Sequence, residues 1–313
     1  MKTKILVTGG AGFIGSSLAA RLAENPDNYV VIADNLLTGK ISHVPKSIHN
    51  NIKFIKADVN EWEDISGIFY TYAFDYVFHY AAIVGVKRTL SIPVKVLNDI
   101  TGIKNILSLC KNTGVKRVLY SSSSEVYGEP VEFPQNEHTT PLNSRLPYAI
   151  VKNLGEAYLR SYYQEYGLSY TIFRLFNTYG PKQSTDFVIS KFLHAAMHNK
   201  DITIYGDGSQ TRTFCYIDDH CEAVTNAFYN KLFVNDVVNV GNDNETNMLD
   251  LAKIIIKLTG SHSKIVHLPK LEEGDMTRRK PDITKMHQLL QRDLTPLEEG
   301  IKNIIHAGAF AHS

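Results

Sequence analysis

The first half of the chain alternates short continuous apolar runs with longer stretches in which apolar residues recur every three or four positions. Continuous apolar runs are typical of strands that are buried on both faces of a parallel sheet. These runs lie at residues 4–8, 29–33, 54–59, 76–82, 118–122 and 169–174. Helical spacing is found between them, at residues 13–24, 93–113 and 147–165. This alternation predicts the α/β class, with a Rossmann-type doubly wound parallel sheet.

The alternation weakens after residue 177, where Gly, Pro and polar residues become frequent. We therefore expect a first domain at 1–177 and a smaller mixed α/β lobe at 178–313. An apolar run at 237–241 predicts one more buried strand, and residues 214–242 are expected to rejoin the first domain. Further helices are expected at 187–197, 218–230, 248–259, 282–291 and 296–307, and a short strand at 202–205.

Composition excludes several classes of protein. The 313 residues carry a formal net charge of +1, with 33 basic against 32 acidic residues, so no nucleic-acid partner is expected. Three cysteines without a Cys-x-x-Cys pair fit a reduced protein better than a disulfide scaffold or a zinc site. No signal peptide and no apolar run of about 18 residues is found. We expect a soluble cytoplasmic protein with no metal and no membrane partner.

A glycine-rich segment directly follows the first expected strand. Residues 9–15 read Gly-Gly-Ala-Gly-Phe-Ile-Gly. Glycines between a strand and a helix let backbone N–H groups and the positive end of the helix dipole meet a pyrophosphate. Asp34 follows the second expected strand, where an acidic residue binds the adenosine ribose of a dinucleotide and repels a 2′-phosphate. This order of features predicts that residues 1–177 bind NAD rather than NADP.

The predicted cofactor site collects residues from the glycine turn, from strand ends and from the motif described next. They are Gly9, Gly12, Phe13, Ile14, Asp34, Asn35, Thr38, Gly39, Asp58, Val59, Ala81, Ala82, Ser121, Tyr148 and Lys152. Thr38 and Gly39 fit a solvated loop equally well, and Asp58 fits a cap or turn nearly as well. Asn60 with Glu63 is typical of a helix N-cap and its partner.

Tyr148 and Lys152 form a second motif. Pro147 is expected to open a helix, and the four-residue spacing places both side chains on one face. Tyrosine has an ordinary pKa of about 10, and a nearby ammonium lowers that value by favouring the phenolate. A hydroxyl from Ser123 would complete a base that removes a proton from an alcohol. The Tyr-x-x-x-Lys spacing is weak by itself and carries weight here because a dinucleotide site precedes it.

Together these motifs resemble the extended short-chain dehydrogenases/reductases that act on nucleotide sugars, the epimerase, dehydratase and decarboxylase family. The residues that carry the resemblance are the glycine turn, Asp34-Asn35, His79-x-Ala81-Ala82, Ser123-Ser124-Glu125-Val126-Tyr127-Gly128, Tyr148-x-x-x-Lys152, Arg174-Leu175-Phe176-Asn177-x-Tyr179-Gly180-Pro181 and Gly206-Asp207-Gly208-x-Gln210-Thr211-Arg212. The resemblance covers nearly the whole chain. It implies NAD as cofactor and a nucleotide sugar as substrate.

The resemblance also implies catalytic roles. Tyr148 takes the proton of the sugar 4-hydroxyl, Ser123 holds that oxygen, and Lys152 holds the nicotinamide ribose. The 4-keto sugar formed from a UDP- or GDP-sugar is then the intermediate of an epimerase or dehydratase, or the product of a 4-dehydrogenase. A UDP-glucuronate decarboxylase is the alternative. A non-catalytic dinucleotide-binding regulator is an alternative of another class.

Substrate-binding residues are expected at strand ends and in the second half of the chain. They are Ser123, Ser124, Asn177, Arg212, Arg279 and Lys87. Arg212 and Arg279 suit the nucleotide diphosphate, because guanidinium matches phosphate oxygens bidentately. Lys87, in an expected loop at 84–88, fits an ordinary solvated residue better than a substrate ligand. Glu125 is the fourth catalytic candidate by resemblance, against a salt-bridged structural role.

Two further expectations come from the resemblance. Asp99 departs from the asparagine that the family usually has near the active site, and a carboxylate there would alter the field around the nicotinamide. The helices at 93–113 and 147–165 are expected to form the interface of a homodimer.

Overall fold

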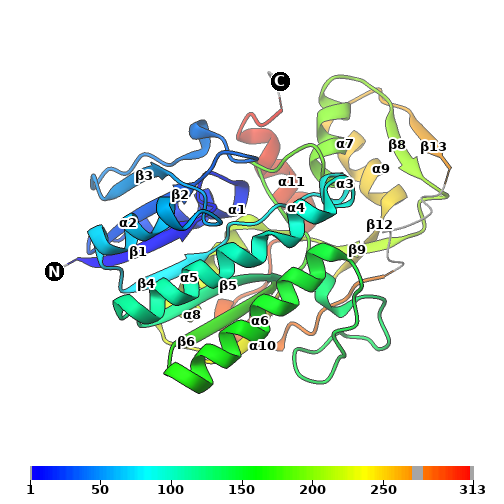
Figure 1. The fold of residues 1–313 in the computed structure, drawn as a ribbon. Helices are drawn as coiled ribbons and strands as arrows, with labels where there is room; N and C mark the ends of the chain where they lie inside the picture. Colours follow the sequence, from blue (N-terminus) through cyan, green and yellow to red (C-terminus); the bar gives the residue numbers. More distant parts are fainter. Residues whose placement is uncertain (1, 270–277, 311–313) are drawn as a thin grey trace.

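A computed structural model describes residues 2–269 and 278–310 of the chain (Figure 1). Its central layer is a parallel sheet of seven described strands in the order β11-β6-β5-β4-β1-β2-β3. The strands are β1 (Thr3–Thr8), β2 (Asn28–Asp34), β3 (Ile52–Lys56), β4 (Tyr76–His79), β5 (Arg117–Ser123), β6 (Ser169–Leu175) and β11 (Asp236–Val240). The expected doubly wound Rossmann-type sheet is confirmed.

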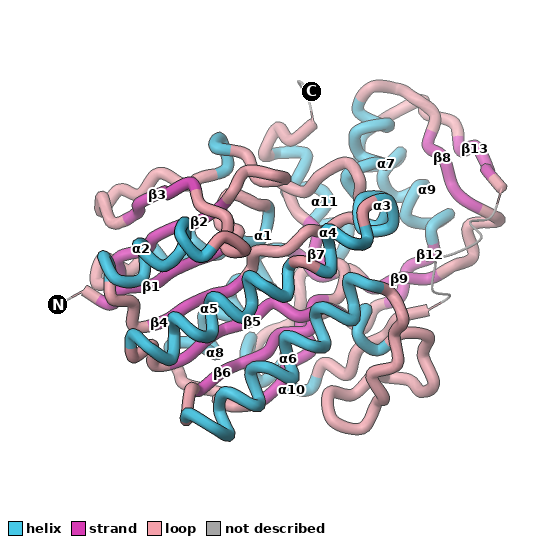
Figure 2. Tube along the Cα trace, in the orientation of Figure 1, coloured by secondary structure: helices cyan, strands magenta, loops and turns pink. Residues whose placement is uncertain are grey.

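Helices cover both faces of this sheet (Figure 2). One face carries α1 (Phe13–Ala23), α8 (Ile217–Tyr229) and α10 (Thr284–Leu290); the other carries α2 (Trp62–Tyr72), α5 (Asp99–Thr113) and α6 (Pro147–Tyr166). Along β1, Ile5 and Val7 belong to the first core and Leu6 to the second. Because successive strand residues serve opposite cores, the strands need continuous apolar runs.

The helix expected at 93–113 is divided into α4 (Pro93–Leu97) and α5. At the break, the Thr101 amide donates to the Asn98 carbonyl, a three-residue step instead of the four-residue step of an α-helix. The prediction of a single long helix was therefore wrong in detail. Local hydrogen bonding at Asn98 interrupts an apolar pattern that is continuous in the sequence.

The loop expected at 84–88 also differs from the structure. Helix α3 (Val86–Ser91) begins within it, and the Thr89 amide donates to the Gly85 carbonyl at 2.9 Å. Gly85 precedes this helix with a φ of +104°, a conformation that glycine adopts readily. A short helix after a sharp turn leaves no apolar periodicity long enough to be recognised.

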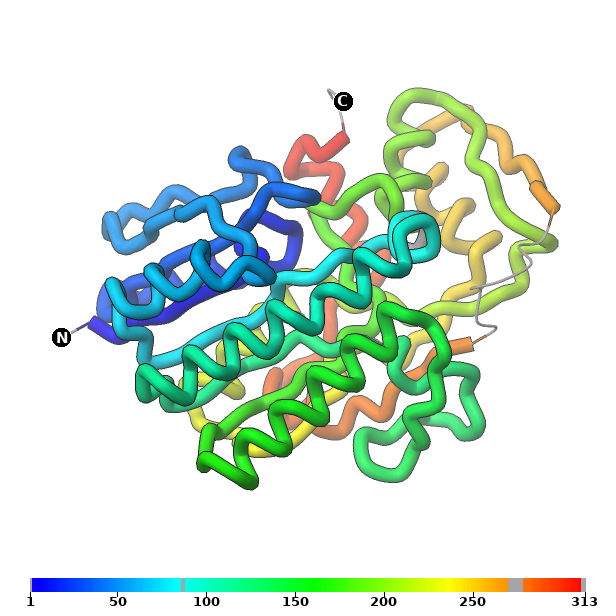
Figure 3. The backbone as a smooth tube through the Cα atoms, in the orientation of Figure 1, coloured from blue at the N-terminus to red at the C-terminus, as the bar shows by residue number. Residues whose placement is uncertain are grey.

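A smaller lobe lies beyond the carboxyl ends of the sheet strands (Figure 1). Its elements are β7 (Thr178–Tyr179) paired with β10 (Cys215–Tyr216), β8 (Ile202–Tyr205) with β13 (Ile265–Leu268), β9 (Thr211–Thr213) with β12 (Glu245–Asn247), and helices α7 (Val188–Met197), α9 (Met248–Thr259) and α11 (Leu297–His306). Figure 3 follows the chain from the sheet into this lobe, back to β11 and out again. The division after residue 177 stays a prediction.

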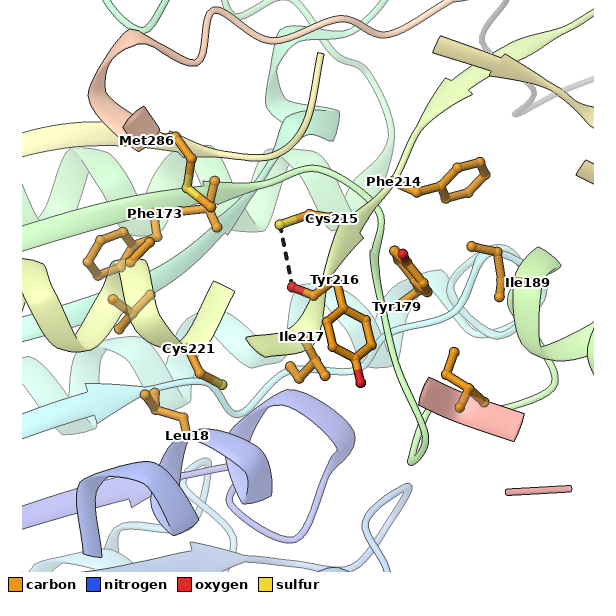
Figure 4. Packing of buried hydrophobic residues seen from close by; sticks show 14 of the residues in the cluster. Leu18, Phe173, Tyr179, Ile189, Phe214, Cys215, Tyr216, Ile217, Cys221 and Met286 are labelled. Atoms are coloured by element: carbon orange, nitrogen blue, oxygen red, sulfur yellow. Dashed lines mark hydrogen bonds between the residues drawn. The ribbon is translucent and has the colours of Figure 1, made fainter. Parts of the chain in front are cut away.

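The apolar core beneath α1 continues into the smaller lobe (Figure 4). Leu18 of α1, Ile217 of α8, Tyr179 of β7 and Ile189 of α7 belong to one buried cluster. The sheet and the lobe therefore share a packed interior. No helix within the described residues is long and apolar enough to cross a membrane.

Candidate active site

A cavity of about 970 Å³ lies at the carboxyl ends of the sheet strands. The strand order reverses between β1 and β4, and open α/β sheets bind ligands beyond such a reversal. Most residues expected from the sequence line this cavity: Gly9, Gly12, Phe13, Ile14, Asp34, Asn35, Thr38, Asp58, Val59, Ala81, Ala82, Ser121, Ser123, Ser124, Glu125, Tyr148, Lys152, Asn177 and Arg279.

Three expected residues are not among the described side chains that line the cavity. Gly39 packs on Asp34, where an added Cβ would lie 2.8 Å from Oδ1. Arg212 lies on β9, and its Nη1 donates to the Thr211 carbonyl at 2.7 Å. Lys87 belongs to α3, but its side chain lies outside the described part of the structure. Their binding roles stay predictions.

The glycine turn fits the pyrophosphate of a dinucleotide. Gly9 has a φ of +69°, and a Cβ there would lie 2.7 Å from the Ala81 amide nitrogen. Gly12 is the N-cap of α1, and a Cβ there would lie 3.1 Å from the Gly9 carbonyl oxygen. The first N–H groups of an α-helix have no partner within the helix, and glycine leaves them uncovered.

Asp34 ends β2 with its carboxylate held in place. Oδ2 accepts a hydrogen bond from the Ala11 amide at 3.0 Å, and Oδ1 accepts one from the Leu36 amide at 2.8 Å. Beside it, Asn35 Nδ2 donates to Asp58 Oδ2 at 2.8 Å. A fixed carboxylate here suits the adenosine ribose hydroxyls and disfavours a 2′-phosphate.

The N-cap expected at Asn60 is wrong. Glu61 occupies the N-cap of α2, and no side chain caps this helix. Asn60 instead reaches α5, where Oδ1 accepts a hydrogen bond from the Gly102 amide at 2.9 Å and Nδ2 donates to Asp99 Oδ1 at 3.5 Å. A tertiary contact replaces the local cap, and Asn60 becomes part of the cavity wall.

Tyr148, Lys152 and Ser123 are brought together by α6 and β5. Lys152 is buried, its Nζ donates to the Ser121 carbonyl at 2.6 Å, and Nζ lies 5.8 Å from the centre of the Tyr148 ring. Ser123 lies close enough to Tyr148 to favour its ionised form, and its Oγ accepts a hydrogen bond from the Glu125 amide at 3.2 Å. A phenol, a hydroxyl and an ammonium thus share one region of the cavity, as proton transfer from an alcohol requires.

The protein surroundings raise the pKa of Tyr148 instead of lowering it. Burial is the main cause, and the Glu125 carboxylate adds to it, while Ser123 and the Arg279 charge oppose it. The lower pKa expected from Lys152 is therefore wrong for the chain itself, because desolvation of the phenolate dominates and the cation that opposes it is Arg279.

Burial also lowers the pKa of Lys152, to about 8, and Asp99 opposes this change. Asp99 lines the cavity, and its Oδ2 accepts a hydrogen bond from the Ile83 amide at 2.7 Å. Burial raises the pKa of Asp99 against the effects of this bond and of Lys152. The Asp99 carboxylate thus acts electrostatically on the lysine beside the phenol.

Arg279 reaches the end of β5 from the C-terminal part of the chain. Its Nη1 lies 3.7 Å from Glu125 Oε1 and donates to Ser124 Oγ at 3.4 Å. The backbone around it is fixed, because Gln135 donates to the Lys280 carbonyl at 2.8 Å. Arg279 is itself buried. The Arg279 guanidinium and the Glu125 carboxylate therefore face each other at the carboxyl end of β5, next to its serines.

Behind the serines lies a buried ion pair that the sequence analysis missed. Arg174 Nη2 lies 2.7 Å from Glu156 Oε2, and both side chains are almost fully buried. Ser122 Oγ donates to Glu156 Oε1 at 2.6 Å, and Arg174 Nη1 donates to the Tyr127 hydroxyl at 2.9 Å. The sequence held a signal for this pair, because Arg174 lies inside the apolar run of β6 and Glu156 lies on the same helix as Tyr148.

Comparison with known proteins decides the family. Residues 5–241 match the model of the NAD dependent epimerase/dehydratase family. The chain belongs to this family. It is therefore an NAD-dependent enzyme that modifies nucleotide sugars, and the expected cofactor and enzyme class are confirmed.

Family members with different reactions are similar to this chain. A UDP-N-acetyl-alpha-D-glucosaminuronate decarboxylase of Bacillus cytotoxicus is 36% identical, with 97% of each chain covered. UDP-glucuronic acid decarboxylase 1 of Xenopus tropicalis is 35% identical over 97% of this chain and 72% of its own length. The solved UDP-glucose 4-epimerase of Thermotoga maritima has a TM-score of 0.91 at 33% identity, covering 97% of this chain and 98% of that one.

Proposed function

We propose that this enzyme oxidises C4 of a UDP-linked uronic acid and removes its C6 carboxylate as carbon dioxide. The observation that carries the proposal is the buried Arg279 guanidinium beside Ser124 and Glu125. A buried cation at the end of β5 suits a substrate that brings a carboxylate to the reacting sugar. The decarboxylase relatives, which are named for uronic acid substrates, support this assignment.

The first step is removal of the 4-hydroxyl proton. Ser123 holds the sugar oxygen and Tyr148 takes its proton, while the Lys152 ammonium stabilises the phenolate as it forms. Burial and Glu125 raise the pKa of Tyr148 although Ser123 and Arg279 oppose them, so a further positive charge is needed to favour the phenolate, and oxidised NAD would supply one at its nicotinamide. Bound NAD supplies the acceptor for the C4 hydride and later returns it.

The second step breaks the C5–C6 bond. A C4 ketone is β to the C6 carboxylate, so the electron pair of the broken bond moves into a C4–C5 enolate as carbon dioxide leaves. The protonated Tyr148 and Ser123 hydrogen-bond the enolate oxygen. Because Glu125 offsets part of the Arg279 charge, the carboxylate is recognised without being fully neutralised, and its electrons stay available. C5 then takes a proton before C4 is reduced.

Product analysis tests this function. The purified enzyme is incubated with UDP-glucuronic acid, UDP-N-acetylglucosaminuronic acid and UDP-glucose, and products are identified by mass spectrometry and NMR. Loss of carbon dioxide from a uronic acid is expected. An unchanged mass with an inverted C4 would instead establish an epimerase, loss of water a dehydratase, and loss of two hydrogens a 4-dehydrogenase.

Arg279→Gln is expected to lower kcat/KM for the uronic acid by about ten- to a hundredfold, the scale of a hydrogen bond to a charged group. Affinity for UDP-glucose, which has no carboxylate, should change by less than about threefold. Arg278→Gln is the matched control, because Arg278 is partly exposed and pairs with Glu245. Equal losses of affinity for UDP-glucose and for UDP would place Arg279 on the diphosphate, as the sequence analysis expected.

We also propose a homodimer through α4 and α6, which contact each other. Both helices expose apolar side chains: Val94 is 73%, Leu97 42%, Ile150 44% and Leu154 42% exposed. Exposed apolar side chains on two helices in contact are typical of an interaction surface. Ile150→Glu with Leu154→Glu is expected to halve the mass measured by light scattering, whereas Leu232→Glu, at another exposed site, should not change it. A wild-type monomer at all concentrations would refute the interface.

A further inference from the structure

Lys182 brings a positive charge to Ser16, which lies in α1 directly after the glycine turn. It follows Gly180, which packs so closely that an added Cβ would lie 3.0 Å from Phe13 Cε2. The Lys182 ammonium donates to Ser16 Oγ on α1 and to the His43 carbonyl, both at 3.2 Å. Lys182, His43 and Phe13 all line the cavity.

The part of the chain that the structure describes offers this charge no acidic partner. Among the described residues, no carboxylate oxygen lies within 4.0 Å of Lys182 Nζ. Burial lowers the pKa of Lys182, because removing the ammonium from water disfavours its charged form. The pKa of His43 is lowered by burial and by the charges of Lys182 and Lys40, so this neighbouring ring is kept neutral by the same positive surroundings. Its buried Nδ1 also lacks a hydrogen-bond partner within the described structure.

We propose that Lys182 binds the pyrophosphate of NAD together with the glycine turn. The N-terminal end of α1 is positive, and Lys182 adds a full charge beside it, so the two favour a group with two phosphates. The pyrophosphate supplies the negative charge that the described residues around Lys182 lack. This role depends on NAD, which the family uses, and not on which sugar reaction follows.

Two other roles predict different behaviour. If Lys182 only donates a hydrogen bond to the His43 carbonyl, its role is to support the loop after Asp34. Its loss should then weaken the binding of every ligand that contains adenosine, with or without phosphate. If Lys182 serves a 2′-phosphate, its loss lowers the affinity for NADP and spares NAD. Ligands that differ only in their phosphates therefore separate the three roles.

The experiment measures dissociation constants of NAD, ADP, adenosine and NADP by calorimetry for the wild type, Lys182→Met and Lys182→Arg. Lys46→Met is the charge-matched control, because Lys46 is exposed on the same loop as His43 and is not among the residues that line the cavity. Near-ultraviolet circular dichroism verifies the fold of each variant.

Lys182→Met is expected to raise the dissociation constants of NAD and ADP by about ten- to a hundredfold, as loss of a charge-assisted hydrogen bond predicts. The dissociation constant of adenosine should rise by less than about twofold. Lys182→Arg should stay within about threefold of the wild type, and the deficit of Lys182→Met should shrink as salt concentration rises. An equal loss for adenosine, a loss confined to NADP, or unchanged NAD affinity would overturn the proposal. If the methionine variant does not fold, weaker NAD binding with unchanged adenosine binding in Lys182→Gln decides instead.

Discussion

Tyr148→Phe is expected to lower turnover by about 10²- to 10⁴-fold, the usual contribution of a positioned acid–base group. The substitution removes one hydroxyl and keeps the ring that packs near Lys152. NAD should still bind, because the glycine turn and Asp34 are untouched. Stopped-flow measurement of NADH formation isolates the oxidation of C4. The loss of rate must appear in this step, before any carbon–carbon bond breaks.

Tyr163→Phe is the control for this variant. Tyr163 is on the same helix, but 44% of it is exposed and it does not line the cavity. It should keep turnover within about twofold of the wild type. Turnover near normal in Tyr148→Phe, with NAD bound, would show that another group takes the 4-hydroxyl proton.

The largest expected change in stability follows from Arg174→Met. This variant leaves Glu156 buried without its main partner, and breaking a buried ion pair costs about 3–5 kcal/mol. Urea denaturation measures the free energy of unfolding. Arg160→Met removes the other arginine that pairs with Glu156, but 43% of that side chain is exposed, so a cost of at most about 1 kcal/mol is expected. Equal costs would refute the argument from burial.

The stability difference depends on pH in a defined direction. Burial by itself raises the pKa of Glu156, but Arg174 and Ser122 outweigh it and hold that pKa below its ordinary value. A lowered carboxyl pKa stabilises the fold above the unfolded pKa of about 4.3, and the contribution is lost as pH falls. The deficit of Arg174→Met should therefore be full at neutral pH and shrink in acid below that value.

Local patterns predicted the elements that depend on short stretches of chain. The continuous run of β1 and the helical spacing of α1 are visible because one strand or one helix must bury its own apolar residues. Asn60 shows where this reasoning fails. Its sequence context suits a helix cap. Its side-chain oxygen instead accepts a hydrogen bond from the Gly102 amide, 42 residues away.

Contacts within one strand–helix–strand unit were predictable from spacing, and contacts between distant segments of the chain were not. Gly9, Gly12 and Asp34 follow each other within one strand–helix–strand unit, so their order alone predicts their proximity. Arg279 reaches Ser124 across 155 positions of sequence, and Lys182 reaches Ser16 across 166. No spacing rule connects such pairs, because loops outside the repeating units set their approach.

The sequence by itself determined the parallel sheet, the glycine turn and the Tyr148–Lys152 face, since each depends on periodicity or on neighbours a few residues apart. Only the tertiary structure decided how these groups are charged and what surrounds them. Burial raises the pKa of Tyr148 and lowers that of Lys152 to about 8. Desolvation depends on the whole packed environment, and no local stretch of the chain contains that information.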